Sequence, residues 1–71
     1  MCVEMVARVV SLDGDAHTAV VDDGMRRHRI STALLALEGV RVVAGDHVAV
    51  HTGIAVRRVS PVEAAARRSV A

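Results

Sequence analysis

Cys2 is the residue with the clearest chemistry in this sequence, because it is the only cysteine and directly follows Met1. Small second residues favour removal of the initiator methionine, so we expect the mature chain to begin with a thiol beside a free α-amine. An unperturbed α-amine has a pKa of about 8 and a thiol a pKa of about 8.5, so both titrate near working pH. Such a chain end can ligate a soft metal or act as a nucleophile. The alternative is a small apolar residue packed under the first strand, although chain ends are poorly buried unless tied down.

Four histidines and scattered carboxylates are the other residues that could form a site. The histidines come with no second cysteine and no His-x-x-x-His helical pair, so we predict no independent zinc site. No pair of carboxylates has a spacing that indicates acid–base catalysis, and so short a chain has little room for an enclosed pocket. We therefore expect an accessory protein and not an enzyme. The histidines are His17, His28, His47 and His51.

The composition predicts one small, cytoplasmic domain. A core of the size that 71 residues can form stabilises by only about 3–5 kcal/mol. One cysteine cannot form an internal disulfide, and the sequence has neither the roughly 20 apolar residues of a membrane span nor a secretion signal. Nine arginines, with no lysine, face eight acidic residues, and the net charge of +1 gives no strong reason to expect nucleic-acid or membrane binding. We expect a monomer when the chain is free.

More than half of the chain is apolar although it contains no aromatic residue, so its core must be aliphatic and rich in β-branched side chains, which favour strands. Turn signals such as Asp22-Asp23-Gly24 and Gly45-Asp46 divide the apolar stretches into short segments. Five strands at this spacing predict an all-β, OB-like five-stranded barrel over residues 1–59. The predicted strands are 3–12, 17–21, 25–30, 47–51 and 54–59.

Two helical segments are predicted beside the strands. Ser31 can cap a short turn over residues 32–38 that ends at Gly39 and plugs one end of the barrel. Its expected apolar contacts are Leu34, Leu35 and Leu37. A C-terminal helix over residues 60–71 starts with Ser60, Pro61 and Glu63 in the order typical of a helix N-terminus. Because a helix of about ten residues is marginal alone, it must dock on the barrel, dock on a partner, or fray.

The third predicted strand is rich in arginine, with Arg26, Arg27 and Arg29. These side chains could form an anion-binding patch, but charged residues on a strand more often cover a solvated face and block edge pairing. Since Asp22 and Asp23 lie nearby, we expect local compensation of the arginine charge. Solubility is the expected role of Arg57, Arg58, Arg67 and Arg68.

Three stretches of the sequence carry a resemblance that covers nearly the whole chain. They are Met1-Cys2-Val3, then Met25-Arg26-Arg27-His28-Arg29-Ile30-Ser31-Thr32-Ala33-Leu34-Leu35, and Gly45-Asp46-His47-Val48-Ala49-Val50-His51-Thr52-Gly53-Ile54-Ala55. In this order and at this spacing they resemble the HypC/HupF/HybG family of hydrogenase-maturation chaperones. No one stretch is specific alone, but the three in combination are.

The resemblance implies a fold and a function. The fold is an OB-like five-stranded barrel with a C-terminal helix. The function is carriage of the Fe(CN)2(CO) iron unit with the maturation protein HypD, followed by delivery to the large-subunit precursor of [NiFe]-hydrogenase. The unit is a transient cargo and not a permanent cofactor. By resemblance, Cys2 holds the iron and contacts the partners, and His51 is the next residue expected to handle the cofactor.

The chain departs from the family pattern at two positions. Family members usually read Cys-x-Gly-x-Pro at the start, whereas this sequence has Glu4 at the glycine and Val6 at the proline. We expect the Glu4 carboxylate to raise the pKa of the Cys2 thiol. Without proline, Val6 lets the first strand extend nearly to the thiol. Both changes suggest an altered partner surface or cargo.

Three other interpretations remain open at this point. The chain could be an RNA-binding OB module similar to bacterial translation initiation factor 1, but such modules stack bases on aromatic side chains, which this sequence lacks. It could be a thiol-redox or thiol-transfer protein in which His51 helps to ionise Cys2. Finally, His51 could be an ordinary hydrogen-bonded residue at a strand end.

Overall fold

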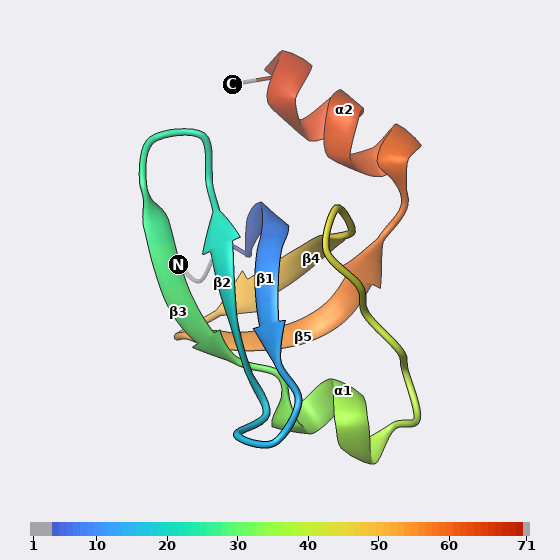
Figure 1. The fold of residues 1–71 in the computed structure, drawn as a ribbon. Coiled ribbons are helices and arrows are strands. Elements are labelled where there is room, and N and C mark those ends of the chain that lie inside the picture. The colour runs from blue at the N-terminus through green and yellow to red at the C-terminus, as the bar shows by residue number, and fades with distance from the viewer. Residues whose placement is uncertain (1–3, 71) are drawn as a thin grey trace.

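The computed structural model describes residues 4–70, and five strands within them close into a barrel (Figure 1). The order around the barrel is β1-β2-β3-β5-β4, so the predicted all-β barrel is confirmed. None of the helices described is long and apolar enough to cross a membrane. The strands are β1 (Met5–Asp13), β2 (Thr18–Asp22), β3 (Arg27–Ser31), β4 (His47–His51) and β5 (Ile54–Val59), and the helices are α1 (Ala33–Leu37) and α2 (Pro61–Val70).

Neighbouring strands are antiparallel except at the closure between β3 and β5. There the only paired positions are Ser31 and Ile54, which run parallel. The Ser31 N–H also donates to the carbonyl oxygen of Gly53 at 2.9 Å. The barrel is therefore closed by a short seam, while the β1–β2, β2–β3, β1–β4 and β4–β5 ladders hold the rest.

The β2–β3 hairpin differs from the sequence prediction, which began the third strand at Met25. In the structure β3 begins at Arg27, because residues 23–26 form the turn. Asp22 Oδ1 accepts the N–H of Gly24 at 2.8 Å, and Asp23 Oδ1 accepts the N–H of Met25 at 2.7 Å. Backbone groups that bond to turn carboxylates are not available to the strand ladder.

The barrel interior is aliphatic, as the composition predicts. β4 shows the alternation: Val48 and Val50 point into the barrel, and Ala49 belongs to a second cluster on the outer face. No polar or charged residue is buried in the part of the chain that the structure describes. The interior cluster consists of Ala7, Val9, Ala19, Val21, Ile30, Leu35, Val48, Val50 and Ala55.

Helix α1 closes one end of the barrel through a single leucine. Leu35 is 1% exposed and belongs to the interior cluster, whereas Leu37 is 85% exposed and Leu34 is 37% exposed. The expectation that all three leucines pack inward is therefore wrong, because a helix of five residues presents only one face to the barrel. Gly39 follows the helix with a φ of 73°, a left-handed conformation that favours glycine.

Helix α2 docks on the outer face of the barrel. Ala64 is 2% exposed and packs with Ala49 and Val59, and Val6 and Val56 complete this outer cluster. The N-terminus of the helix has the predicted cap, since the Glu63 N–H donates to Ser60 Oγ at 3.1 Å. The sequence left open whether this helix docks on the barrel, docks on a partner or frays, and in the structure it docks on the barrel.

We expect Val48→Asp to unfold the barrel. The substitution buries a carboxylate among aliphatic side chains, and a buried polar group without a partner costs about 2–7 kcal/mol, as much as the whole core of such a chain provides. The control is Val62→Asp, because Val62 is 80% exposed in the first turn of α2 and should tolerate the change within about 0.5 kcal/mol. Circular dichroism during urea unfolding measures both, and a Val48→Asp chain as stable as the control would contradict the observed core.

Candidate functional site

Cys2, the first candidate residue, lies outside the described residues, and the structure shows where the described chain enters the barrel after Glu4. Met5 of β1 pairs with Val50 of β4, and Val6 pairs with Ala49. The start of β1 therefore runs alongside the end of β4, where His51 is the last residue. His51 therefore lies at the end of the β1–β4 ladder where β1 begins.

His51 is held at the start of a tight turn, and its side chain is half-buried. It pairs with Ile54 across the two residues Thr52 and Gly53, whose φ angles are 49° and 78°. Two successive left-handed residues are typical of a type I′ hairpin, and glycine favours the second position. Thr52 Oγ1 donates to the carbonyl oxygen of His51 at 2.7 Å. The His51 imidazole makes no hydrogen bond within residues 4–70, so nothing there supports the alternative of a hydrogen-bonded structural histidine.

A cluster of three charged side chains connects the start of the chain to helix α2. Arg57 Nη2 lies 3.1 Å from Glu4 Oε1 and 2.8 Å from Glu63 Oε2, and Arg57 Nη1 lies 3.2 Å from Glu63 Oε1. Arg57 therefore donates two parallel hydrogen bonds to Glu63 and one to Glu4. The hydrogen bonds that Arg57 donates to Glu63, and then the one that it donates to Glu4, raise the pKa of Arg57 above its ordinary value. We call Glu4, Arg57 and Glu63 the charged triad.

The triad changes the interpretation of both departures from the family pattern. The sequence indicated only that Glu4 places a carboxylate near the thiol in the chain. In the structure this carboxylate pairs with the guanidinium of Arg57, which compensates its negative charge. Val6 packs in the outer cluster against which Ala64 of α2 docks. Glu4 and Val6 therefore both connect the start of β1 to helix α2, one by charge and one by apolar contact.

Arg57 is the site residue that the sequence prediction missed, since it was expected only to aid solubility. A weak signal existed, because Glu63 follows Arg57 by six residues across the turn into α2. The bond to Glu4 spans 53 residues and could be found only once β1, β4 and β5 were placed side by side. Arg58, by contrast, is exposed and donates to the carbonyl oxygen of Arg41 at 3.2 Å.

The arginine-rich hairpin shows a second departure from expectation. Asp23 Oδ1 accepts the N–H groups of Met25 and Arg26, and Asp23 Oδ2 lies 2.6 Å from His28 Nε2. An ionised carboxylate only accepts, so the imidazole donates in this bond. The backbone bonds from Arg26 and Met25, and then the bond from His28, lower the pKa of Asp23 well below its usual range.

The two aspartates therefore bind the turn and not the arginines. Neither Asp22 nor Asp23 forms an ion pair with an arginine, and in the described part of the chain no carboxylate pairs with Arg26, Arg27 or Arg29. The aspartates thus form no direct ion pair with the arginines, because their carboxylates accept the N–H groups of the turn, although Asp22 faces Arg27 across the β2–β3 ladder.

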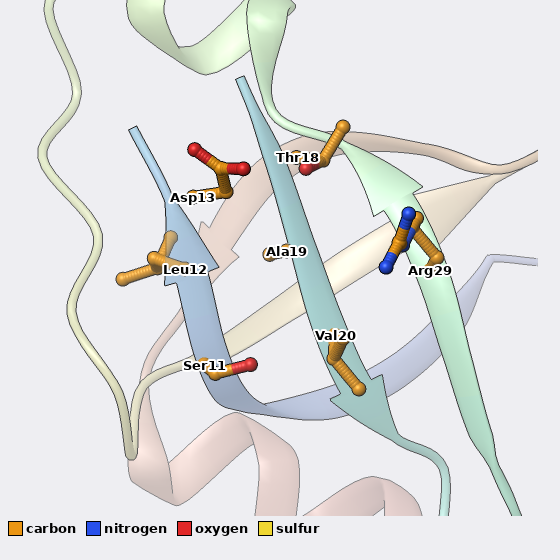
Figure 2. A pocket seen from close by; sticks show the side chains of 7 residues that line it. All are labelled: Ser11, Leu12, Asp13, Thr18, Ala19, Val20 and Arg29. Atoms are coloured by element: carbon orange, nitrogen blue, oxygen red, sulfur yellow. The ribbon is translucent and has the colours of Figure 1, made fainter. Parts of the chain in front are cut away.

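Two hollows of the surface lie away from Glu4 and His51. Figure 2 shows one of about 120 Å³ between β1, β2 and β3, below the roughly 300 Å³ at which ligand pockets begin. Another, of about 390 Å³, is lined by residues 45–47 and 58–61. Neither of these two hollows is lined by Glu4 or His51. No three histidine, cysteine or acidic side chains within the described residues are placed to hold a metal ion. The first hollow is lined by Ser11, Leu12, Asp13, Thr18, Ala19, Val20 and Arg29.

Comparison with known proteins agrees with the resemblance in the sequence. The sequence model of the HupF/HypC family matches residues 1–70. The chain belongs to the HupF/HypC family. It is 41% identical over 64 residues to a protein of Cupriavidus necator named hydrogenase maturation factor HypC. The match covers 90% of this chain and 66% of the length of that relative. The family predicted from the three sequence stretches is therefore confirmed.

We expect Arg57→Gln to loosen helix α2 of this HupF/HypC protein while leaving the barrel folded. The change removes the guanidinium that bonds both Glu4 and Glu63, and it does not alter the interior cluster. The measurement is hydrogen exchange at the Ala64 amide, which bonds to the Ser60 carbonyl in the first turn of α2. Exchange should be faster in Arg57→Gln than in the control Arg58→Gln. Equal exchange in both variants would show that the triad does not hold the helix.

We expect the stability that Asp23 contributes to fall in acid. Because the pKa of Asp23 is lower in the folded chain, its contribution is complete above the unfolded value of about 3.9 and is lost as the pH falls towards the folded value. The difference in urea midpoint between the unaltered chain and Asp23→Ala should therefore be constant from about pH 5 to pH 8 and shrink below about pH 4. Asp15→Ala, in an exposed turn, is the control. A difference that grows in acid would contradict the bonding seen in the hairpin.

Proposed function

We propose that this protein is a [NiFe]-hydrogenase maturation factor that carries the Fe(CN)2(CO) unit with a HypD-type protein and delivers it to the large-subunit precursor. The observation that carries the proposal is the family match over residues 1–70, which includes the Met1-Cys2 start. The name of the Cupriavidus necator relative supports hydrogenase maturation as the process. The substrate, the partners and the order of transfer are inferred from the family resemblance and from chemistry.

The proposed ligand of the iron is the Cys2 thiolate. Cyanide and carbon monoxide make low-spin iron soft, and a thiolate suits a soft centre better than a carboxylate or imidazole does. Cys2 is the only thiol of the chain. One cysteine supplies one ligand, so the partner must provide other contacts to the iron unit. That requirement agrees with transient carriage between two proteins.

His51 is proposed to assist in handling the iron unit from its place beside the start of β1. It ends β4 beside the start of β1, and its imidazole has no hydrogen-bond partner within residues 4–70. A histidine with an uncommitted ring can donate a hydrogen bond to a bound anion or to a partner protein. We propose that the chain itself catalyses no reaction, because its role is to hold the cargo and release it.

The test is hydrogenase activity in a strain that lacks its own carrier, complemented by variants at equal abundance. Cys2→Ser keeps size and hydrogen bonding nearly unchanged, so the fold should survive while activity disappears. His51→Ala should lower activity with a loss of at most about 1 kcal/mol of stability, the scale of one hydrogen bond.

His47→Ala is the matched control, because His47 is half-buried at the other end of the same strand. It should restore activity fully. Full complementation by Cys2→Ser would refute the carrier function, whereas an unstable His51→Ala chain with normal activity per folded molecule would show that His51 is structural.

A further inference from the structure

The chain contains two Asp-Gly pairs, and each lies at a turn between strands of the barrel. Asp13 is the last residue of β1 and precedes Gly14, whereas Asp23 and Gly24 directly follow β2. In an Asp-Gly pair the backbone nitrogen of the glycine can attack the side-chain carboxyl carbon of the aspartate, because glycine has no side chain to obstruct the approach. Both pairs share this intrinsic reactivity, so the structure around each pair decides which one reacts.

The Asp23-Gly24 pair is held at both of its reacting groups. The Gly24 N–H donates to Asp22 Oδ1 at 2.8 Å, so the nitrogen is engaged. Asp23 Oδ1 accepts two backbone N–H groups of the turn at 2.7 and 2.9 Å, and Oδ2 lies 2.6 Å from His28 Nε2. The backbone bonds, and then the bond from His28, lower the pKa of Asp23 and keep its carboxyl ionised. An ionised carboxylate resists attack by a nucleophile, so the fold protects this pair.

The Asp13-Gly14 pair is held much more loosely. Asp13 Oδ1 accepts the N–H groups of Asp15 and Ala16 at 3.2 and 3.3 Å, which is the long limit for such bonds. Within the described residues, neither Asp13 Oδ2 nor the Gly14 N–H has a hydrogen-bond partner. Both residues are exposed, whereas Asp23 is half-buried. The reacting nitrogen and carboxyl group of this pair are therefore open to rearrangement and to water.

The end of β1 can also accept a change in its backbone. The β1–β2 ladder ends at the pair of Asp13 and Thr18, and the last residue of β1 in the interior cluster is Val9. Apart from its neighbours in the chain, no heavy atom lies within 4 Å of the point where a side chain of Gly14 would begin. An extra backbone atom at Asp13 therefore leaves the core in place.

We propose that Asp13-Gly14 is a modification site at which the folded chain forms isoaspartate, while Asp23-Gly24 is protected. The Gly14 nitrogen forms a bond to Asp13 Cγ, and the carboxyl hydroxyl leaves with the amide proton as water. Water then opens the resulting five-membered succinimide ring. Opening at the bond between the nitrogen and Cγ restores aspartate. Opening at the bond between the nitrogen and the backbone carbonyl carbon gives isoaspartate, and the reaction consumes no oxidant or other reagent.

The test is peptide mapping of the purified full chain after storage in the folded state at neutral pH. Cleavage after arginine releases residues 9–26 as one peptide that contains both pairs, and fragment ions specific to isoaspartate locate it at Asp13 or Asp23. Isoaspartate should accumulate at Asp13 at least about tenfold faster than at Asp23, because each hydrogen bond to a charged group that must break slows the reaction about tenfold or more. Equal rates at the two positions would overturn the proposal.

Two controls show whether the fold and the Gly14 nitrogen are responsible. In urea both pairs lose their hydrogen bonds, so isoaspartate should form at similar rates at Asp13 and Asp23. A preference for Asp13 that persists unchanged in urea would overturn the proposal, because it would come from the neighbouring sequence and not from the fold. Gly14→Ala adds a methyl group in open space and should keep the fold while it slows the reaction at Asp13. An undiminished rate in this variant would contradict attack by the Gly14 nitrogen.

Discussion

Close packing of alanine and valine inside the barrel is the constraint on which the rest of this structure depends. The interior has no aromatic side chain, and small residues such as Ala7, Ala19 and Ala55 let the five strands approach closely enough to close. A core of this kind leaves no space for an internal ligand, so any chemistry must take place on the outside. The same shortage of core volume explains why the outer face is used as well, where α2 covers Ala49 and Val59.

On the outer face of the barrel, the start of β1 is connected to helix α2. Helix α2, strand β5 and the start of β1 meet at the charged triad, so the segment that leads to Cys2 is attached to the barrel by Glu4. Surface ion pairs contribute little individually, but a guanidinium shared by two carboxylates fixes the relative position of three segments. In this member of the HupF/HypC family, a glutamate and a valine at the two divergent positions connect the chain start to the C-terminal helix. The departures therefore have a structural role within the barrel, in addition to any effect on cargo or partner.

Much of the fold could be predicted from the sequence because its signals are local. Turns at Gly24 and Gly45 set the strand boundaries to within two residues, and the Ser60 cap gave the start of α2. Non-local features could not be predicted in the same way. The Glu4–Arg57 bond depends on strand order, and the exposure of Leu37 depends on how a short helix meets the barrel. Asp23 was expected to pair with a nearby arginine side chain, but its carboxylate accepts the backbone N–H groups of Met25 and Arg26 in its own turn.

The candidate site was predictable mainly through the family, since spacing alone gives no role to Cys2 or His51. The structure adds the placement of His51 beside the start of β1 and, through its partner Ile54, near Ser31 at the end of β3.

The central claim, carriage of an iron unit on Cys2, is tested most directly by infrared spectroscopy of the chain isolated from maturation-competent cells through a tag after Ala71. The account predicts cyanide and carbonyl stretching bands in the complex with the HypD-type protein, and their absence when Cys2→Ser is isolated at equal abundance. Bands of equal intensity in the two preparations would contradict it, because the iron unit would then be held without the thiol of this chain.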